Sequence, residues 1–69
     1  MTDTHHKPPP PAPADIRAHR TTAGHTQAAA AAMVYTDTRT WQKWESGTAR
    51  MHPATWELYR IKTATLKNI

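Results

Sequence analysis

Four short stretches of the chain are expected to form helices, and apolar side chains at helical spacing are clearest in the third and fourth. The third stretch shows this pattern best, because Trp41 and Trp44 fall on one side of a helix. The opposite side is polar and carries Thr38, Arg39, Gln42, Lys43 and Ser46. No stretch shows the strict alternation of a β-strand. The pattern therefore predicts an all-α protein.

The first two helices are bounded by residues that commonly cap helices. We expect a first helix that follows Asp15 as its N-cap and runs to about Ala23, with Gly24 ending it in the left-handed conformation. Thr26 can cap a second helix over 27–34. The five consecutive alanines of this helix have high helix propensity and allow a neighbouring helix to approach closely.

Capping and terminating residues also predict the bounds of the third and fourth helices. The third is expected over 38–46, capped by Asp37 or Thr36 and ended by Gly47. Only "YTD" separates it from the second helix, which is the spacing of a helix-turn-helix. The fourth should begin with a proline and cover about 53–62 or slightly more. Its inward side is expected to carry Trp56, Tyr59 and some of Leu58 and Ile61.

The beginning of the chain has a different composition. Residues 1–14, "MTDTHHKPPPPAPA", hold all but one of the six prolines and almost nothing to bury. Consecutive prolines favour an extended polyproline II conformation, so we expect a disordered or semi-rigid tail that serves as a spacer or a docking peptide. Residues 15–69 are then one small folded domain.

Charge and length limit the possible functions. The 69 residues include nine Lys and Arg against five Asp and Glu, a net charge of +4, and only one of the basic residues lies in the tail. Such a surplus favours a polyanionic partner such as nucleic acid. There is no cysteine, and no apolar run approaches the roughly 20 residues needed to cross a bilayer. We therefore expect a soluble, cytoplasmic protein without a membrane segment.

A family resemblance rests on "GHTQAAAAAMVYTDTRTWQKWESG", with "IRAHR" before it and "RMHPATWELYRIK" after it. These residues resemble the phage repressor and Cro type of helix-turn-helix protein, the Xre family. The similarity covers 15–62 without a gap and is most specific in "TQ" and "TWQKWESG". It implies a small four-helix, lambda-repressor-like fold, with 27–34 as scaffold helix and 38–46 as the recognition helix that enters the major groove.

The resemblance also implies roles for individual residues. The positions turned toward base edges are Thr38, Arg39 and Lys43, with Gln42 beside them on the same face. The positions near the DNA backbone are Thr26, Gln27, Thr48 and Arg50. Gln27 matches a position that binds a phosphate or braces the first recognition-helix side chain. Arg20 and Glu45 match a structural ion pair.

Several positions depart from the family pattern. His19, His25 and Ala30 stand where the family commonly has apolar residues, which thins an already small core. Tyr35 stands where the turn often has a glycine in the left-handed region. A non-glycine residue there typically costs on the order of 1 kcal/mol.

The polar side of the third helix has suitable chemistry for reading DNA, independent of the family. Arg39 can offer two donors to O6 and N7 of guanine, Gln42 can pair with adenine, and a threonine methyl can contact a thymine methyl. Lys43 can reach a base or a phosphate. The alternative is a polar face that only contacts solvent. Trp41 and Trp44 fit core packing better than stacking on unpaired bases.

Enzymatic chemistry is not indicated. There is no glycine-rich phosphate loop, no nucleophile motif and no cluster with metal-ligand spacing, so we expect no catalytic residue, no metal and no cofactor. Two adjacent histidines in the tail, His5 and His6, rarely form a metal site. His19 and His25 fit partly buried packing positions.

Two functions from different classes remain. The first is sequence-specific binding of double-stranded DNA as a small transcriptional repressor or autoregulator. One helix-turn-helix makes few base contacts, so we expect a homodimer on an inverted repeat, joined through the fourth helix, Leu66 and Ile69. The alternative is a protein-interaction module of the same fold, such as an antitoxin or a repressor partner, that uses the proline tail and "TATLKNI".

Overall fold

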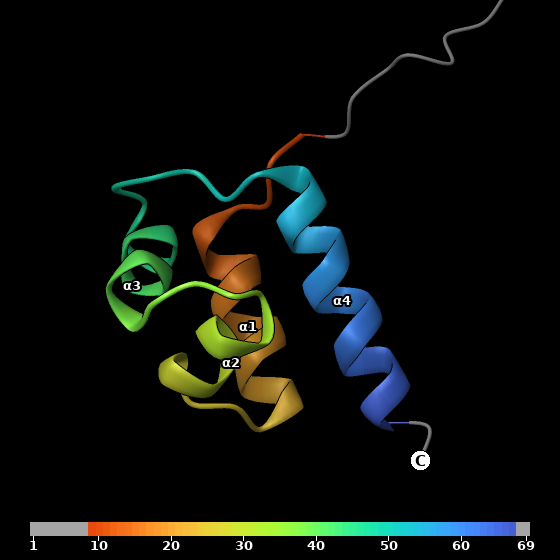
Figure 1. The fold of residues 1–69 in the computed structure, drawn as a ribbon. Helices are drawn as coiled ribbons and strands as arrows, with labels where there is room; N and C mark the ends of the chain where they lie inside the picture. Colours follow the sequence, from red (N-terminus) through yellow and green to blue (C-terminus); the bar gives the residue numbers. More distant parts are fainter. Residues whose placement is uncertain (1–8, 68–69) are drawn as a thin grey trace, which may run out of the picture.

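Four helices make up the described part of the chain, which covers residues 9–67 in the computed structural model. They are α1 (Pro13–Ala23), α2 (Gln27–Met33), α3 (Thr38–Ser46) and α4 (Pro53–Lys67), and no strand occurs among the described residues (Figure 1). The predicted all-α, four-helix fold is confirmed. Most of the predicted tail lies outside the described residues, as do Ile69 and the side chain of Leu66.

The start of α1 differs from the prediction. The helix begins at Pro13 with Ala12 as its N-cap, and Asp15 lies in the first turn instead of capping it. Proline suits this place because its fixed φ matches a helix and its missing N–H would have no partner there. The carboxylate of Asp15 still lies at the positive end of the helix dipole. The N-cap of α1 thus lies three residues before the predicted one.

The other predicted helix caps are present. The hydroxyl of Thr26 accepts a hydrogen bond from the Ala29 N–H at 3.0 Å. A carboxylate oxygen of Asp37 accepts one from the Thr40 N–H at 2.7 Å, and this contact lowers the pKa of Asp37. Gly24 and Gly47 end α1 and α3 with φ of 81° and 84°, a region that glycine adopts without strain.

The turn between α2 and α3 carries backbone strain that α4 offsets. Tyr35 has φ of 61°, as expected from the glycine-like position that it occupies. The Lys62 ammonium donates to the Met33 carbonyl and to the Tyr35 hydroxyl, both at 2.8 Å. The same ammonium lies 4.2 Å from the centre of the Tyr35 ring, close enough for a cation–π contact. Lys62 therefore attaches the turn to α4.

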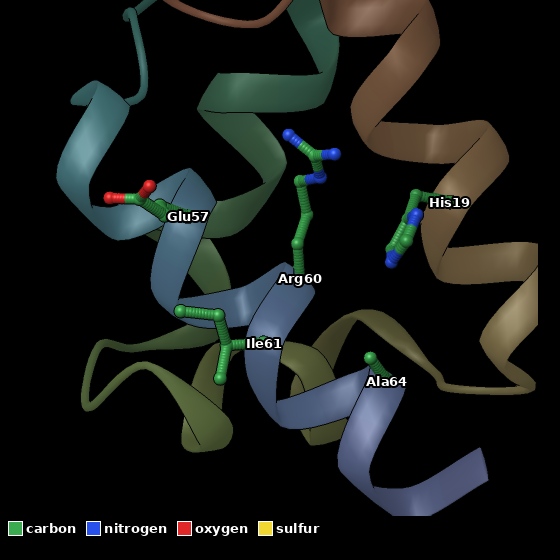
Figure 2. Close-up of a pocket in the computed structure, with 5 residues that line it drawn as sticks. All are labelled: His19, Glu57, Arg60, Ile61 and Ala64. Carbon is green, nitrogen blue, oxygen red and sulfur yellow. The ribbon is translucent and has the colours of Figure 1, made fainter. Parts of the chain in front are cut away.

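The last helix extends to Lys67, beyond the predicted end near Lys62. Tyr59 is fully buried and Trp56 and Leu58 are half-buried, whereas Ile61 is 58% exposed. A shallow groove beside the helix is lined by His19, Glu57, Arg60, Ile61 and Ala64. Figure 2 shows four of these residues along α4, with His19 on the facing α1. Ile61 thus belongs to the outer surface of α4.

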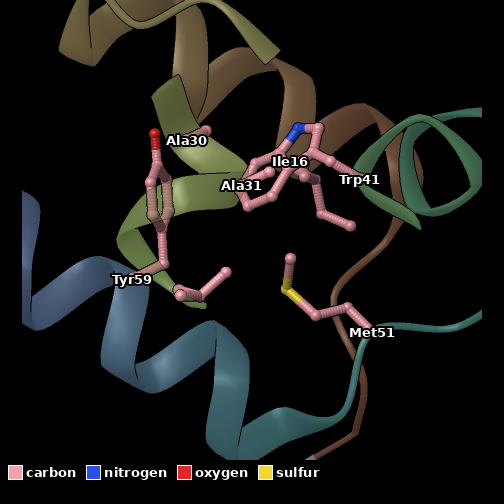
Figure 3. Close-up of a cluster of buried hydrophobic side chains, with 7 residues drawn as sticks. Ile16, Ala30, Ala31, Trp41, Met51 and Tyr59 are labelled. Atoms are coloured by element: carbon pink, nitrogen blue, oxygen red, sulfur yellow. The ribbon is translucent and has the colours of Figure 1, made fainter. Parts of the chain in front are cut away.

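Small and large side chains complement one another in the core. The buried apolar residues are Ile16, Ala30, Ala31, Val34, Trp41, Met51 and Tyr59 (Figure 3). The rings of Trp41 and Tyr59 meet edge to face, with centres 5.0 Å apart. The two buried alanines of α2 leave the volume that these rings fill, because a folded interior is close-packed. The close approach of α2 therefore depends on alanine.

We expect Ala31→Leu to lower the free energy of unfolding by about 1–3 kcal/mol, because the larger side chain cannot enter a filled core without displacing neighbours. Ala32→Leu is the matched control in the same helix, since Ala32 is exposed, and its effect should stay within about 0.5 kcal/mol. Urea denaturation of both variants measures the difference. Equal stabilities would contradict the tight packing of α2.

Candidate nucleic-acid interface

The outer face of α3 brings the predicted base-contacting residues together. Arg39, Gln42 and Lys43 are exposed, and Thr38 is half-buried at the first position of the helix. On the opposite side Trp41 is fully buried and packs against Tyr59 of α4. The helix therefore presents a polar, basic face to solvent while its inner side is fixed in the core.

Glu45 connects three helices through its carboxylate. One oxygen accepts from the Arg20 Nε at 2.5 Å and from the Trp41 Nε1 at 2.6 Å. The other accepts from the second guanidinium nitrogen of Arg20 and from the Gln27 amide, each at 3.1 Å. The predicted Arg20–Glu45 ion pair is thus present, and the network also includes two partners that the sequence pattern did not predict.

The network keeps Glu45 ionised. Burial by itself would raise the pKa of this carboxyl, since its side chain is only 1% exposed. Hydrogen bonds from Arg20, Trp41 and Gln27 outweigh burial and lower the pKa to about 2. The hydrogen bond between Arg20 and Glu45 also raises the pKa of Arg20. Both partners are therefore charged over the whole physiological pH range.

Gln27 extends the network to the outer face of α3. Its amide nitrogen donates to Glu45, and its amide oxygen accepts from the Gln42 nitrogen at 3.3 Å. The donation to a carboxylate fixes which end of the Gln27 amide is the acceptor, and this in turn orients the Gln42 amide. Gln27 is thus a brace, although it braces Gln42 and not the first residue of α3. A phosphate contact by Gln27 stays a prediction.

The other predicted backbone-contacting residues lie near the ends of α2 and α3. Thr26 is exposed, and its hydroxyl proton remains a donor while the oxygen caps α2. Thr48 is held against the end of α3, because its N–H donates to the Lys43 carbonyl at 3.0 Å. Arg50 is exposed in the loop that follows. It borders a shallow groove whose other walls are Pro10, Pro11, Ala12, Pro13, Trp44, Gly47 and Ala49.

The histidines that replace expected apolar residues are packed against α4. The His25 Nδ1 lies 2.9 Å from the Tyr59 hydroxyl, and the His19 Nε2 lies 2.9 Å from the Thr63 hydroxyl. Both imidazole rings meet the Tyr59 ring at steep angles. Within residues 9–67, no three His, Cys, Asp or Glu side chains converge on a possible metal position. These histidines thus contribute to packing.

Arg17 is a basic residue near this face that the sequence analysis did not single out. Its Nε lies 3.6 Å from a carboxylate oxygen of Glu45, and its side chain is 65% exposed. Its spacing in the sequence could have indicated this position. Arg17 precedes Arg20 by about one helical turn, so both side chains lie on the same side of the helix and close to Glu45.

Comparison with known proteins adds no relative to this picture. A scan against protein-family models and a search of curated proteins each gave no match. Among the described helices, none combines the length and apolar character that a membrane span needs. The Xre-type resemblance therefore stays a hypothesis that rests on the residues themselves.

We expect stability to fall as acid protonates Glu45. The pKa of this carboxyl is about 2 in the folded chain, below its ordinary 4.5, so its contribution is present above pH 4.5 and is lost toward pH 2. The loss should amount to roughly 2–4 kcal/mol. Urea denaturation between pH 2 and 7 measures it. Glu45→Gln should be less stable at pH 7 and show a shallower decline.

Glu57→Gln, which removes an exposed carboxylate, is the control for the loss of one negative charge. If Glu45→Gln proves too unstable to measure, NMR titration of the wild-type Glu45 carboxyl gives the same information. A midpoint near 4.5 would refute the strong pairing.

Proposed function

We propose that this protein is a small transcriptional regulator, a repressor or autoregulator, that binds double-stranded DNA sequence-specifically through the outer face of α3. One observation carries the proposal: Arg39, Gln42 and Lys43 are exposed together on a helix whose opposite side is held by Trp41 and Glu45. A reading helix needs this combination, because its donors must keep fixed positions relative to base edges.

The side chains on this face suit the major groove. Arg39 can donate two parallel hydrogen bonds to guanine O6 and N7, and Gln42, oriented by Gln27, can pair with adenine. Thr38 lies at the first position of α3, from which recognition helices typically reach bases. Lys43 can reach either a base or a phosphate. Each good bidentate pair contributes about 1–3 kcal/mol of discrimination.

Backbone contacts would fix the position of α3 in the groove. Thr26 at the start of α2 and Thr48 after the end of α3 are exposed and carry hydroxyls, and Arg50 adds an exposed cation beyond the end of α3. The net charge of +4 supports attraction to a polyanion. Such contacts set register and affinity, whereas the residues of α3 set sequence preference.

A symmetric dimer would supply enough contacts for specificity. The α2–α3 pair resembles a phage-repressor helix-turn-helix, and proteins of this kind bind two half-sites about 34–36 Å apart. We expect a homodimer on an inverted repeat. Ile61, which is 58% exposed on α4, is an apolar side chain that such an interface could cover.

Protein docking is a second candidate function. Tyr35 is 82% exposed and Ile61 is 58% exposed, and exposed apolar side chains mark an interaction site where they form a contiguous patch. Under this alternative a polypeptide partner would bind these residues. Loss of Arg39 and Lys43 would then leave partner binding unchanged.

We expect Arg39→Ala and Arg50→Ala to weaken DNA binding in different ways. Arg39→Ala should relax preference at one base pair of each half-site, with a cost of about 1–3 kcal/mol per half-site on the preferred duplex. Arg50→Ala should weaken all sequences by a similar factor and reduce the salt dependence, because it removes a phosphate contact. Fluorescence anisotropy with a selected duplex and its single-base-pair variants measures both effects.

The fold of each variant is checked by circular dichroism. Wild-type binding that does not depend on salt would contradict the proposed mechanism. An Arg39→Ala variant with unchanged base preference would show that the reading face is assigned wrongly.

A further inference from the structure

Arg17 has an exposed charge beside a carboxylate that is already satisfied. Glu45 accepts hydrogen bonds from Arg20, Trp41 and Gln27, and the Arg20 guanidinium balances its charge. The Arg17 Nε lies 3.6 Å away, which is longer than a hydrogen bond. Glu45 thus attracts Arg17 electrostatically and leaves its guanidinium donors available for another anion. The side chain is 65% exposed, so this anion can come from solvent.

The position of Arg17 places it on the α3 side of α1. Side chains two residues apart on a helix point about 200° from each other, so Arg17 and His19 lie on opposite flanks. His19 faces α4, where its ring meets those of Trp56 and Tyr59. Arg17 is therefore turned away from α4.

Contacts with α3 give the same placement. The first turn of α1 runs beside the end of α3, because a Cβ built on Gly47 would lie 3.6 Å from the Pro13 Cγ. One turn later, Arg17 approaches the Glu45 oxygen that also accepts from Gln27. Gln27 in turn contacts Gln42 on the outer face of α3. A chain of polar contacts thus leads from Gln42 on α3 through Gln27 and the buried Glu45 to Arg17.

We propose that Arg17 binds a DNA phosphate on the flank of the groove that α3 enters, so that α1 is part of the interface. This inference rests on the proposed function. Guanidinium suits the role, because its planar donors match two phosphate oxygens. Glu45 acts as a positioning residue, since its buried charge keeps the exposed cation close to α3.

The test compares Arg17→Gln with Arg60→Gln. Both changes remove one arginine charge, but Arg60 lies on α4, over the Trp56 ring and beside the groove in Figure 2. Binding of each variant to a selected duplex and to a scrambled duplex is measured across a salt series. Arg17→Gln should weaken both duplexes by a similar factor, roughly five- to tenfold per protomer at 0.1 M salt, and make the slope of log K against log salt less negative by about 0.9 for each bound protomer. Arg60→Gln should leave the slope unchanged.

The outcomes separate the two proposals. If the wild type binds neither duplex, the proposed function itself is wrong. If it binds with a steep salt dependence and Arg17→Gln matches Arg60→Gln, only the role of Arg17 is overturned. If Arg17→Gln changes the base preference but not the salt dependence, the proposed phosphate contact of Arg17 is also overturned. If Arg17→Gln does not fold, Arg17→Ala serves instead, and it should reduce the slope by the same amount.

Discussion

The buried carboxylate of Glu45 fixes how α3 lies against the rest of the protein. Its two oxygens receive hydrogen bonds from α1, from α2 and from α3 itself. A buried charge is costly unless its partners are placed well, so alternative packings of these helices would leave Glu45 or Arg20 unpaired. This constraint selects one arrangement of the three helices, whatever its net contribution to stability.

The same network reaches the surface that we propose for DNA binding. From Glu45 it passes through Gln27 to Gln42, so an exposed side chain of α3 is oriented by a buried charge. Core packing also holds α3 in place, because the alanines of α2 leave room for the buried Trp41 side chain of α3. The strained turn at Tyr35 is held by Lys62 of α4. The face of α3 is thus held by contacts beneath it and by the braced turn that precedes it.

Local features of the fold were predictable from sequence, and long-range contacts were less so. The caps at Thr26, Asp37 and Gly47 follow from backbone groups a few residues away, and all three are present. The start of α1 was predicted three residues late, because two capping preferences, an acidic N-cap and a first-position proline, compete there. The Arg20–Glu45 pair came from a family resemblance. The contacts of Arg17 and Lys62 depend on helix approach, which periodicity does not determine.

Selection of bound duplexes from a random DNA pool, repeated at two salt concentrations, tests the central claim most directly. The account predicts enrichment of an inverted repeat whose half-sites lie about one helical turn apart, with weaker recovery at the higher salt concentration. Failure of the folded protein to enrich any sequence would contradict specific reading by α3. It would instead favour docking of a protein partner on the exposed Tyr35 and Ile61.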